Sequence, residues 1–341
     1  MKKFRRYVNN LIVFIVKELR GFKYNGFFKN LYFYSKGFTS KSVFLFEINR
    51  KNYKKYFSDF DRLFVNCNGE YRAIMDNKLL FYYAFSPYID VPETYYVIKD
   101  NKIYPLGKLA ENQTSVIDFL NISGKLILKP IRGMFGKGIK VLEKKDSYFL
   151  NEQPINAYEL ISYLGNCNGY FISEYIKQSE FADKFYYRTV NTLRLLTIFD
   201  NKTGMHTMPI GIMRIGNSKS YPVDNTDKGA ISIFIDVQTG LLGRGVYIKN
   251  KKKYFCESHI DTHVKFKGEK IPNWNIIKNA ILKTTLQFPT LKYIAWDVAL
   301  TDNGFKLLEI NNVSGFGTFQ IHKPFFELGA IKDNYKMLFS E

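Results

Sequence analysis

The sequence predicts an α+β fold in which β-hairpins outnumber β-α-β units. The strongest observation is the turn Asp302-Asn303-Gly304 between two apolar strand patterns, which is typical of a hairpin. Strand patterns cover residues 91–98, 102–106, 125–129, 139–143, 170–175, 192–199, 205–214, 231–237, 293–300 and 305–310. Helical patterns separate only some of them, at residues 76–85, 156–164 and 274–286. This mixture excludes a regular Rossmann alternation, and 341 residues suffice for two or three lobes.

The first 72 residues predict a basic helical and small α/β region. Residues 1–35 have a helical pattern, and short strands are predicted at 43–48 and 63–66. An apolar stripe recurs in the first helix at spacings of three and four: Phe4, Tyr7, Val8, Leu11, Ile12, Ile15 and Leu19. We expect this stripe to pack on the protein's own core. The alternative is a basic amphipathic helix that lies on anionic lipid.

The net charge of +19 favours polyanionic partners, including nucleotide phosphates. The basic residues are scattered, however, and no nucleic-acid-binding motif is present, so no nucleic-acid partner is expected. Three distant cysteines indicate a reducing compartment without disulfides. No apolar stretch is long enough to span a bilayer, which predicts a cytoplasmic protein, at most peripheral at the inner face of the membrane.

Two carboxylates and an amide converge on the predicted C-terminal hairpin. A three-residue turn centred on Asn303 would place Asp297 opposite Glu309, with Asn311 on the same face. Facing like charges repel unless a cation lies between them, and three hard oxygen ligands suit Mg²⁺. The alternative is a pair of solvated carboxylates on an exposed hairpin.

A glycine-rich stretch follows a strand that ends at Lys129-Pro130. Gly133, Gly136 and Gly138 would let backbone amides approach phosphate oxygens, although the spacing alone is a weak signal. The stretch is not a Walker A loop, because a glycine follows Lys137. Its position between two strands suits a nucleotide lid.

Arg194 and Arg214 lie in apolar strand patterns, where a buried arginine needs a partner. They predict either a structural ion pair or a clamp on a phosphate or substrate carboxylate. The four histidines have no convincing metal-ligand spacing, and no nucleophile with an adjacent base is evident.

In this order, the features resemble the ATP-grasp superfamily, and most closely its sugar-transfer-associated family. The resemblance runs from about residue 76 to 323 and rests on LILKP at 126–130, VNTLR at 190–194, PVDN at 222–225, HIDT at 259–262, IPNW at 271–274, WD at 296–297 and LEIN at 308–311. It implies two α+β subdomains that grip ATP between them, with the basic helical N-terminal region as an addition. The implied divisions are residues 1–72, then a catalytic region 73–341 with a lid subdomain at about 124–175 and a metal-binding subdomain at about 176–341.

The resemblance also implies residue roles. Nucleotide binding is implied for Lys78, Lys129, the three lid glycines and the hinge Glu174-Tyr175-Ile176, with Gln178 and Glu180 as alternative ribose ligands. Arg194 and Arg214 match phosphate and substrate arginines, and Asn225 resembles a substrate-side asparagine. Asp297, Glu309 and Asn311 match the Mg²⁺ ligands. Gly229-Ala230 departs from the paired glycines of relatives.

The implied activity is that of an ATP- and Mg²⁺-dependent carboxylate–amine ligase, with an acyl phosphate intermediate and ADP as a product. The family description suggests surface-polysaccharide biosynthesis, with a carboxylate and an amine as substrates and a sugar nucleotide or lipid-linked glycan as a partner. The alternatives are a peptide or poly-amino-acid ligase of the same fold and a non-enzymatic polyanion-binding protein.

Overall fold

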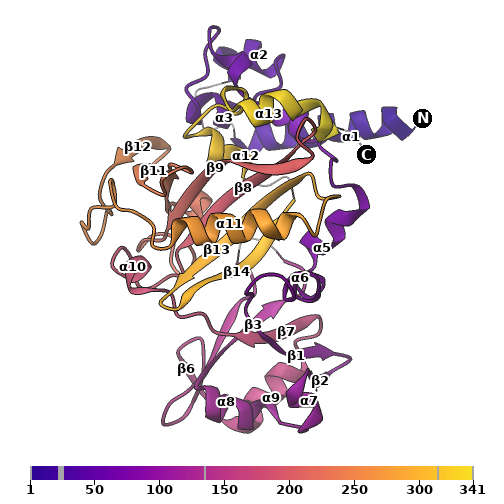
Figure 1. The fold of residues 1–341 in the computed structure, drawn as a ribbon, viewed down its shortest axis with the longest axis vertical. Helices are drawn as coiled ribbons and strands as arrows, with labels where there is room; N and C mark the ends of the chain where they lie inside the picture. The colour runs from indigo at the N-terminus through magenta and orange to yellow at the C-terminus, as the bar shows by residue number, and fades with distance from the viewer. Residues whose placement is uncertain (1, 22–26, 134–135, 313–314, 340–341) are drawn as a thin grey trace. The chain divides into compact units, whose positions relative to one another are not determined.

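The protein is an α+β chain with two antiparallel sheets (Figure 1), which confirms the predicted class. The computed structural model describes residues 2–21, 27–133, 136–312 and 315–339. The chain forms two compact units. The first unit comprises Met1–Arg72, Glu180–Val298 and Asn311–Glu341, and the second comprises Ala73–Ser179 and Ala299–Ile310.

The second unit is built on a seven-stranded sheet with the order β2-β1-β7-β3-β4-β5-β6. Its strands are β1 (Thr94–Lys99), β2 (Lys102–Pro105), β3 (Lys125–Pro130), β4 (Lys140–Lys144), β5 (Tyr148–Leu150), β6 (Gln153–Ile155) and β7 (Tyr170–Glu174). Its helices are α5 (Ala73–Asp76), α6 (Lys78–Phe85), α7 (Lys108–Glu111), α8 (Val116–Ser123) and α9 (Ala157–Gly165). Most of these elements lie where the sequence periodicity predicts them.

Local chemistry fixes the ends of the two helices that cover this sheet. Asn156 and Glu159 form a capping box at the start of α9, and Ser115 caps α8. Leu120 of α8 and Leu160 of α9 are fully buried against strand residues such as Leu128. Figure 1 shows α7, α8 and α9 together at one side of the sheet. These contacts hold β3, and therefore Lys129, in a fixed position.

A second seven-stranded sheet has the order β12-β11-β10-β9-β8-β13-β14, and most of its residues belong to the first unit. The strands are β8 (Thr192–Asp200), β9 (Met205–Ile215), β10 (Ile231–Ile235), β11 (Leu242–Lys249), β12 (Lys252–Cys256), β13 (Tyr293–Thr301) and β14 (Gly304–Asn311). The longest helix after the N-terminal region is α11 (Trp274–Thr285), and the short helix α10 (Glu180–Asp183) precedes β8. In Figure 1, α11 crosses one face of the strands β8, β9 and β13.

A core on this sheet joins the two ends of the chain. Leu196, Ile212 and Tyr293 of the sheet pack with Phe57 from the N-terminal region and with Phe316, Phe319, Phe325, Ile331 and Leu338 from the C-terminal region. The contributing helices include α12 (Phe316–Gln320), α13 (Gly329–Asn334) and the 3-10 turn Tyr335–Phe339. The N-terminal residues are therefore part of the first unit and not a separate appendage.

Helices and turns replace the two strands predicted between residues 41 and 75. Among the described residues of this region, the elements are α1 (Lys2–Gly21), α2 (Phe27–Tyr34), α3 (Ser40–Leu45), α4 (Asp59–Arg62) and short 3-10 turns at Tyr53–Lys55 and Gly69–Arg72. The prediction of a strand at 43–48 is wrong because Thr39 caps α3, accepting a hydrogen bond from Ser42 N and donating one to Asp59. At 63–66 the chain makes turns, and Asn66 N donates to Leu338 O.

The apolar stripe of α1 does not pack on the core as expected. Leu11, Ile12, Ile15 and Leu19 are exposed, whereas Phe14 is buried. The exposed surface of Tyr7 is also substantial, Val8 is half-buried, and the side chain of Phe4 lies outside the described residues. The expectation was wrong because polar side chains, described below, decide which face of α1 packs. No helix in the described ranges is long and apolar enough to cross a membrane.

The turn of the C-terminal hairpin also differs from the expectation. β13 ends at Thr301 and β14 begins at Gly304, so the loop contains only Asp302 and Asn303. Gly304 adopts φ 140°, which lets the strand begin one residue earlier than predicted. The expected pairing of Asp297 with Glu309 depended on a three-residue turn and stays a prediction.

Asn68 connects the N-terminal region to β13 and provides a test of this architecture. Its side chain is buried, donates to Tyr293 O at 2.8 Å and accepts from Lys292 N at 2.7 Å. Asn68→Ala should lower the free energy of unfolding by about 2–4 kcal/mol, because buried backbone groups lose their partners. Chemical denaturation measures this. Asn112→Ala, at an exposed position, should stay within about 0.5 kcal/mol of wild type. An equally small effect at Asn68 would contradict the anchoring role.

Candidate functional site

Two lysines and a glutamate of the second unit lie together beside the glycine-rich stretch. Lys78, at the start of α6, is 3.4 Å from Glu309 Oε2 and donates to Gly133 O at 2.8 Å. Lys129, on β3, interacts electrostatically with both Lys78 and Glu309. The structure thus brings together three residues that the sequence predicts for phosphate and metal binding.

The environment of Lys129 favours its neutral form more than water does. The pKa of Lys129 is lowered to about 8, mainly by burial; Glu309 opposes this shift, Lys78 adds to it and Glu174 opposes it. The ammonium group also lies 5.6 Å from the ring centroid of Phe171. A bound phosphate would add negative charge beside two lysines that share one carboxylate. The site therefore suits an anion such as a nucleotide phosphate.

The glycine-rich stretch contains positions where a side chain would not fit. Gly138 has φ +78°, and an added Cβ would lie 2.7 Å from the hydroxyl of Tyr170. An added Cβ at Gly133 would lie 2.9 Å from Pro130 Cγ. Gly136 also has a positive φ of 68°. Met134 and Phe135 lie outside the described residues. Glycine is therefore required at these positions by the packing of Tyr170 and Pro130 and by the backbone conformation.

The predicted adenine hinge follows β7. Glu174 accepts from Glu93 N at 3.1 Å and pairs with Lys306 at 2.8 Å, and Lys306 also contacts Asp90 at 3.1 Å. The side chain of Glu174 is thus engaged in an ion pair, which leaves a backbone role for the hinge as the resemblance implies. Tyr175 lies under the ammonium of Lys125 at 4.5 Å, and Ile176 is buried.

The two candidates for the ribose ligand differ in exposure. Gln178 is buried in the second unit, and the following Ser179 N donates to Leu300 O at 2.8 Å. Glu180 is exposed and begins α10 in the first unit. Each has contacts within the chain. The choice between them stays open.

The first unit contains a buried cluster of two arginines and two carboxylates. Arg194 on β8 makes two hydrogen bonds to Asp297 on β13, from Nε to Oδ1 at 2.7 Å and from Nη2 to Oδ2 at 2.6 Å. Arg214 on β9 donates to the same Oδ2 at 3.2 Å, and so does Asn311 Nδ2 at 3.3 Å. Asp297 is only 3% exposed, so it is not the solvated carboxylate of the alternative interpretation.

Thr192 and Asp224 extend this cluster, and the sequence analysis did not assign them a role. The Thr192 hydroxyl accepts from Arg214 Nε at 2.9 Å and donates to Asp224, whose Oδ2 also lies 3.4 Å from Arg214 Nε. Burial raises the pKa of Asp224, while Arg214 and Thr192 favour its ionised form. Thr192 lies in the motif VNTLR and Asp224 in PVDN. Their place in these motifs is the sequence signal that could have identified them.

Asn225 is occupied by local structure. Its Oδ1 accepts from Asp227 N at 2.8 Å and caps the 3-10 turn Thr226–Lys228. The turn ends at Gly229, which adopts φ 101° in the loop where the sequence departs from its relatives. A substrate contact by Asn225 stays a prediction, and its neighbour Asp224 is the residue that joins the arginine cluster.

The predicted metal ligands are distributed over both units. Asp297 and Asn311 meet in the first unit, whereas Glu309 belongs to the second. Within the described ranges, no group of three or more His, Cys, Asp or Glu is placed to hold a metal ion. Mg²⁺ does not require one, because it usually takes one or two carboxylates and completes its shell with phosphates and water. Carboxylate and amide oxygens are the donors that fit this ion.

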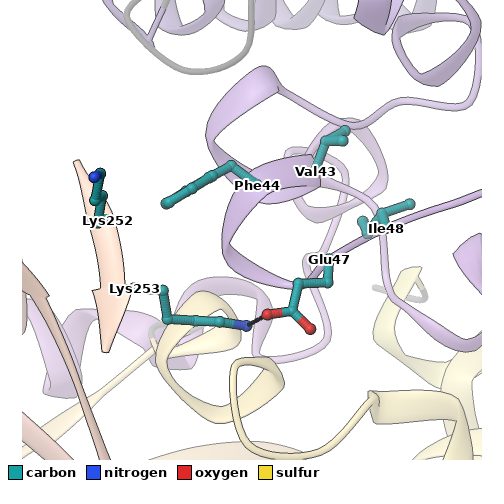
Figure 2. Close-up of a pocket in the computed structure, with 6 residues that line it drawn as sticks. All are labelled: Val43, Phe44, Glu47, Ile48, Lys252 and Lys253. Carbon is teal, nitrogen blue, oxygen red and sulfur yellow. Dashed lines mark ion pairs between the residues drawn. The ribbon is translucent and has the colours of Figure 1, made fainter. Parts of the chain in front are cut away.

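A cavity of about 510 Å³ lies elsewhere in the first unit (Figure 2). It is lined by Val43, Phe44, Glu47, Ile48, Lys252 and Lys253. Figure 2 shows that Lys253 and Glu47 face each other as an ion pair, 2.5 Å apart, and Lys253 also donates to Leu45 O. The residues predicted to bind nucleotide, metal or substrate do not line this cavity.

The chain thus has two α+β units built on antiparallel sheets, one with a lysine pair beside a glycine-rich loop and the other with a buried arginine–carboxylate cluster. This arrangement suits an ATP-grasp protein. The sequence model of the sugar-transfer associated ATP-grasp family matches residues 61–326, well over half of the chain. The chain belongs to this family, within the ATP-grasp superfamily. ATP and Mg²⁺ are typical cofactors of this fold.

Solved structures of ATP-grasp ligases resemble the chain more distantly. PsnB, complexed with a precursor variant, Mg and ADP, is 11% identical over 74% of this chain and 55% of that chain, with a TM-score of 0.37. D-alanine–D-alanine ligase from Bacillus anthracis is 17% identical over 78% and 66%, with a TM-score of 0.39. D-alanyl-alanine synthetase A from Vibrio cholerae is 12% identical over 78% and 64%, with a TM-score of 0.42.

The family assignment does not depend on these structures, whose TM-scores are all under 0.5. The chain spans between about half and two thirds of their lengths. No curated protein sequence gave a match.

The lowered pKa of Lys129 predicts a pH dependence of stability. Between about pH 8 and 10.5, the unfolded lysine keeps a proton that the folded one has lost, so stability rises with pH in this window. Below pH 8, Lys129 is protonated in both the folded and the unfolded protein, so the full free-energy cost of holding its charge in the folded protein is present. Lys129→Met should remove this cost. Its stability advantage over wild type should therefore shrink by roughly 1–3 kcal/mol between pH 7.5 and 10.

Denaturant unfolding at the two pH values measures this difference, because other titrating groups are common to both proteins. Lys102→Met, at an exposed position of β2, is the matched control and should show no such narrowing. If the stabilities of wild type and Lys129→Met change with pH in the same way, the pKa of Lys129 is not lowered in the folded protein.

Proposed function

We propose that the protein is an ATP-dependent carboxylate–amine ligase that releases ADP and forms an acyl phosphate intermediate. The observation that carries the proposal is the cluster of Lys78, Lys129 and Glu309 beside the glycine-rich loop. Two cations beside a single carboxylate leave an excess of positive charge for phosphates. Membership of the ATP-grasp superfamily supports the same conclusion.

In this proposal the chain's residues bind and orient the reactants. Lys78 and Lys129 hold the nucleotide phosphates, and the glycine-rich loop excludes water that would hydrolyse the acyl phosphate. Arg194 and Arg214 offset negative charge on the transferred phosphoryl group or on the substrate carboxylate. Asp297 accepts a hydrogen bond from Arg194 and Thr192 accepts one from Arg214, and these bonds orient both guanidinium groups. A substrate amine then replaces the phosphate at the acyl carbon, so no side-chain nucleophile is needed.

Asp297, Glu309 and Asn311 are the residues that would hold Mg²⁺. The ion, when bound, would neutralise phosphate charge during phosphoryl transfer. Arg194 and Arg214 pair with Asp297, whose buried charge must be compensated.

The substrate class follows from the family description alone. We propose a sugar carboxylate or an amino acid as the acid component, joined to an amine during surface-polysaccharide biosynthesis. The partner would be a sugar nucleotide or a lipid-linked glycan. ADP release across a panel of carboxylates and amines tests this, with products identified by mass spectrometry. Turnover with amino acids alone would assign a peptide ligase, and no ATP turnover with any pair would reject the ligase.

The nucleotide site predicts the behaviour of Lys129→Ala. Loss of a half-buried cation that contacts phosphate should weaken ATP binding about 10–100-fold, the equivalent of one or two charge-assisted hydrogen bonds. Isothermal titration calorimetry measures this, with Lys102→Ala as the exposed control. Because Lys129 is costly to bury, its replacement should not lower the melting temperature. An ATP affinity equal to that of wild type would place the nucleotide elsewhere.

The metal site predicts that Glu309→Ala abolishes ADP formation while the protein stays folded. Glu309 is only half-buried and contributes little to the core, but Mg²⁺ would lose a carboxylate ligand. The coupled assay should be run over a Mg²⁺ titration, with Glu111→Ala on α7 as an exposed control. Wild-type turnover of Glu309→Ala at saturating Mg²⁺ would remove Glu309 from the metal site.

A further inference from the structure

Helix α1 packs through its more polar face. Glu18 is buried and accepts hydrogen bonds from Ser40 N at 2.7 Å, Ser40 Oγ at 2.6 Å and Tyr34 OH at 2.8 Å. One and two turns earlier, Phe14 packs on Phe60 and Asn10 donates to Leu63 O at 3.1 Å. These residues recur at a spacing of four and lie on one face of the helix. They fix the orientation of α1 on the first unit.

This orientation leaves a continuous apolar surface in contact with solvent. We call it the α1 apolar surface; it consists of Leu11, Ile12, Val13, Ile15, Val16 and Leu19. Ile12 is 53% exposed, Ile15 48% and Leu19 64%. Isolated exposed apolar residues are ordinary, but six on two successive turns of one helix indicate a surface that binds something.

The charges on α1 are mostly positive. The sequence of the helix contains Lys2, Lys3, Arg5, Arg6, Lys17 and Arg20, and its single acid is the buried Glu18. Arg5 and Arg6 are exposed. Lys17 is half-buried, and burial together with the charge of Arg62 lowers its pKa. An apolar surface bordered by cations, without an exposed acid, has the composition of helices that lie in the interface of an anionic bilayer.

We propose that the α1 apolar surface binds the surface of an anionic phospholipid membrane, with α1 parallel to the membrane plane. The aliphatic side chains would enter the headgroup region, and the basic residues would contact lipid phosphates. A second copy of the chain fits less well, because pairing the same surface twice would bring the cations of both helices together. The proposal concerns where the protein binds and does not depend on the ligase activity.

Cosedimentation of the full-length protein with vesicles tests the proposal. Vesicles of phosphatidylcholine mixed with phosphatidylglycerol should bind the protein, and salt should weaken this binding. Pure phosphatidylcholine vesicles should bind it much less. The triple variant Ile12→Gln, Ile15→Gln, Leu19→Gln should lose more than about tenfold in partitioning, because three aliphatic contacts are removed. Arg5→Gln should lose about fivefold, since one basic residue near an anionic surface contributes on the order of 1 kcal/mol.

The control variant Ile122→Gln with Ile276→Gln removes exposed apolar side chains from α8 and α11 and should bind vesicles like wild type. Thermal melts should show the triple variant folded, because its substituted side chains are exposed. If it is not, the single variant Ile12→Gln replaces it. Equal partitioning of wild type and the Gln variants, or no binding to anionic vesicles, would overturn the proposal. So would a dimer that the Gln substitutions dissociate in the absence of lipid, which would assign the surface to a second copy.

Discussion

The burial of Asp297 is the constraint on which the first unit depends. A carboxylate buried within a sheet is costly unless charged partners compensate it. Here the partners are Arg194 on β8, the strand beside β13, and Arg214 on β9, one strand further away. The arginines in turn need acceptors, which Thr192 and Asp224 supply. Apolar packing stabilises the sheet, whereas the hydrogen bonds of this polar cluster fix the orientation of the Arg194, Arg214 and Asp297 side chains.

Periodicity predicted most elements between residues 76 and 310, because each has a strong local signal. Strands β8, β9 and β13 are apolar and bounded by turn residues, and α9 begins at a capping box that is visible in the sequence. Prediction failed where a distant contact decides. The segment 43–48 has strand-like residues, yet the bond between Thr39 and Asp59 supports a helix. The stripe of α1 was assigned to the core because the sequence does not show that Ser40 and Tyr34 bind Glu18.

The sequence predicted which residues belong to the candidate site, but not which side chains form hydrogen bonds or ion pairs with one another. The motifs identified Lys78, Lys129, Arg194, Arg214 and Asp297, and the structure groups these residues within their units. The motifs did not show that Glu174 is paired with Lys306 or that Asn225 caps a turn. Such pairings join residues separated by up to 132 positions and depend on side-chain direction, which neither spacing nor charge pattern specifies.

The core that joins both ends of the chain limits how this enzyme family can be recombined. Residues 61–326 carry the family signature, but Phe57 precedes them, and Met337 and Leu338 follow them in the same buried cluster. A chimera that exchanges only the signature region would leave a catalytic sheet with an unfilled apolar face. A chimera between relatives should therefore include the segments before and after the signature region. Substitutions in the N-terminal and C-terminal helices should also be coupled in evolution, because their side chains fill the same buried core.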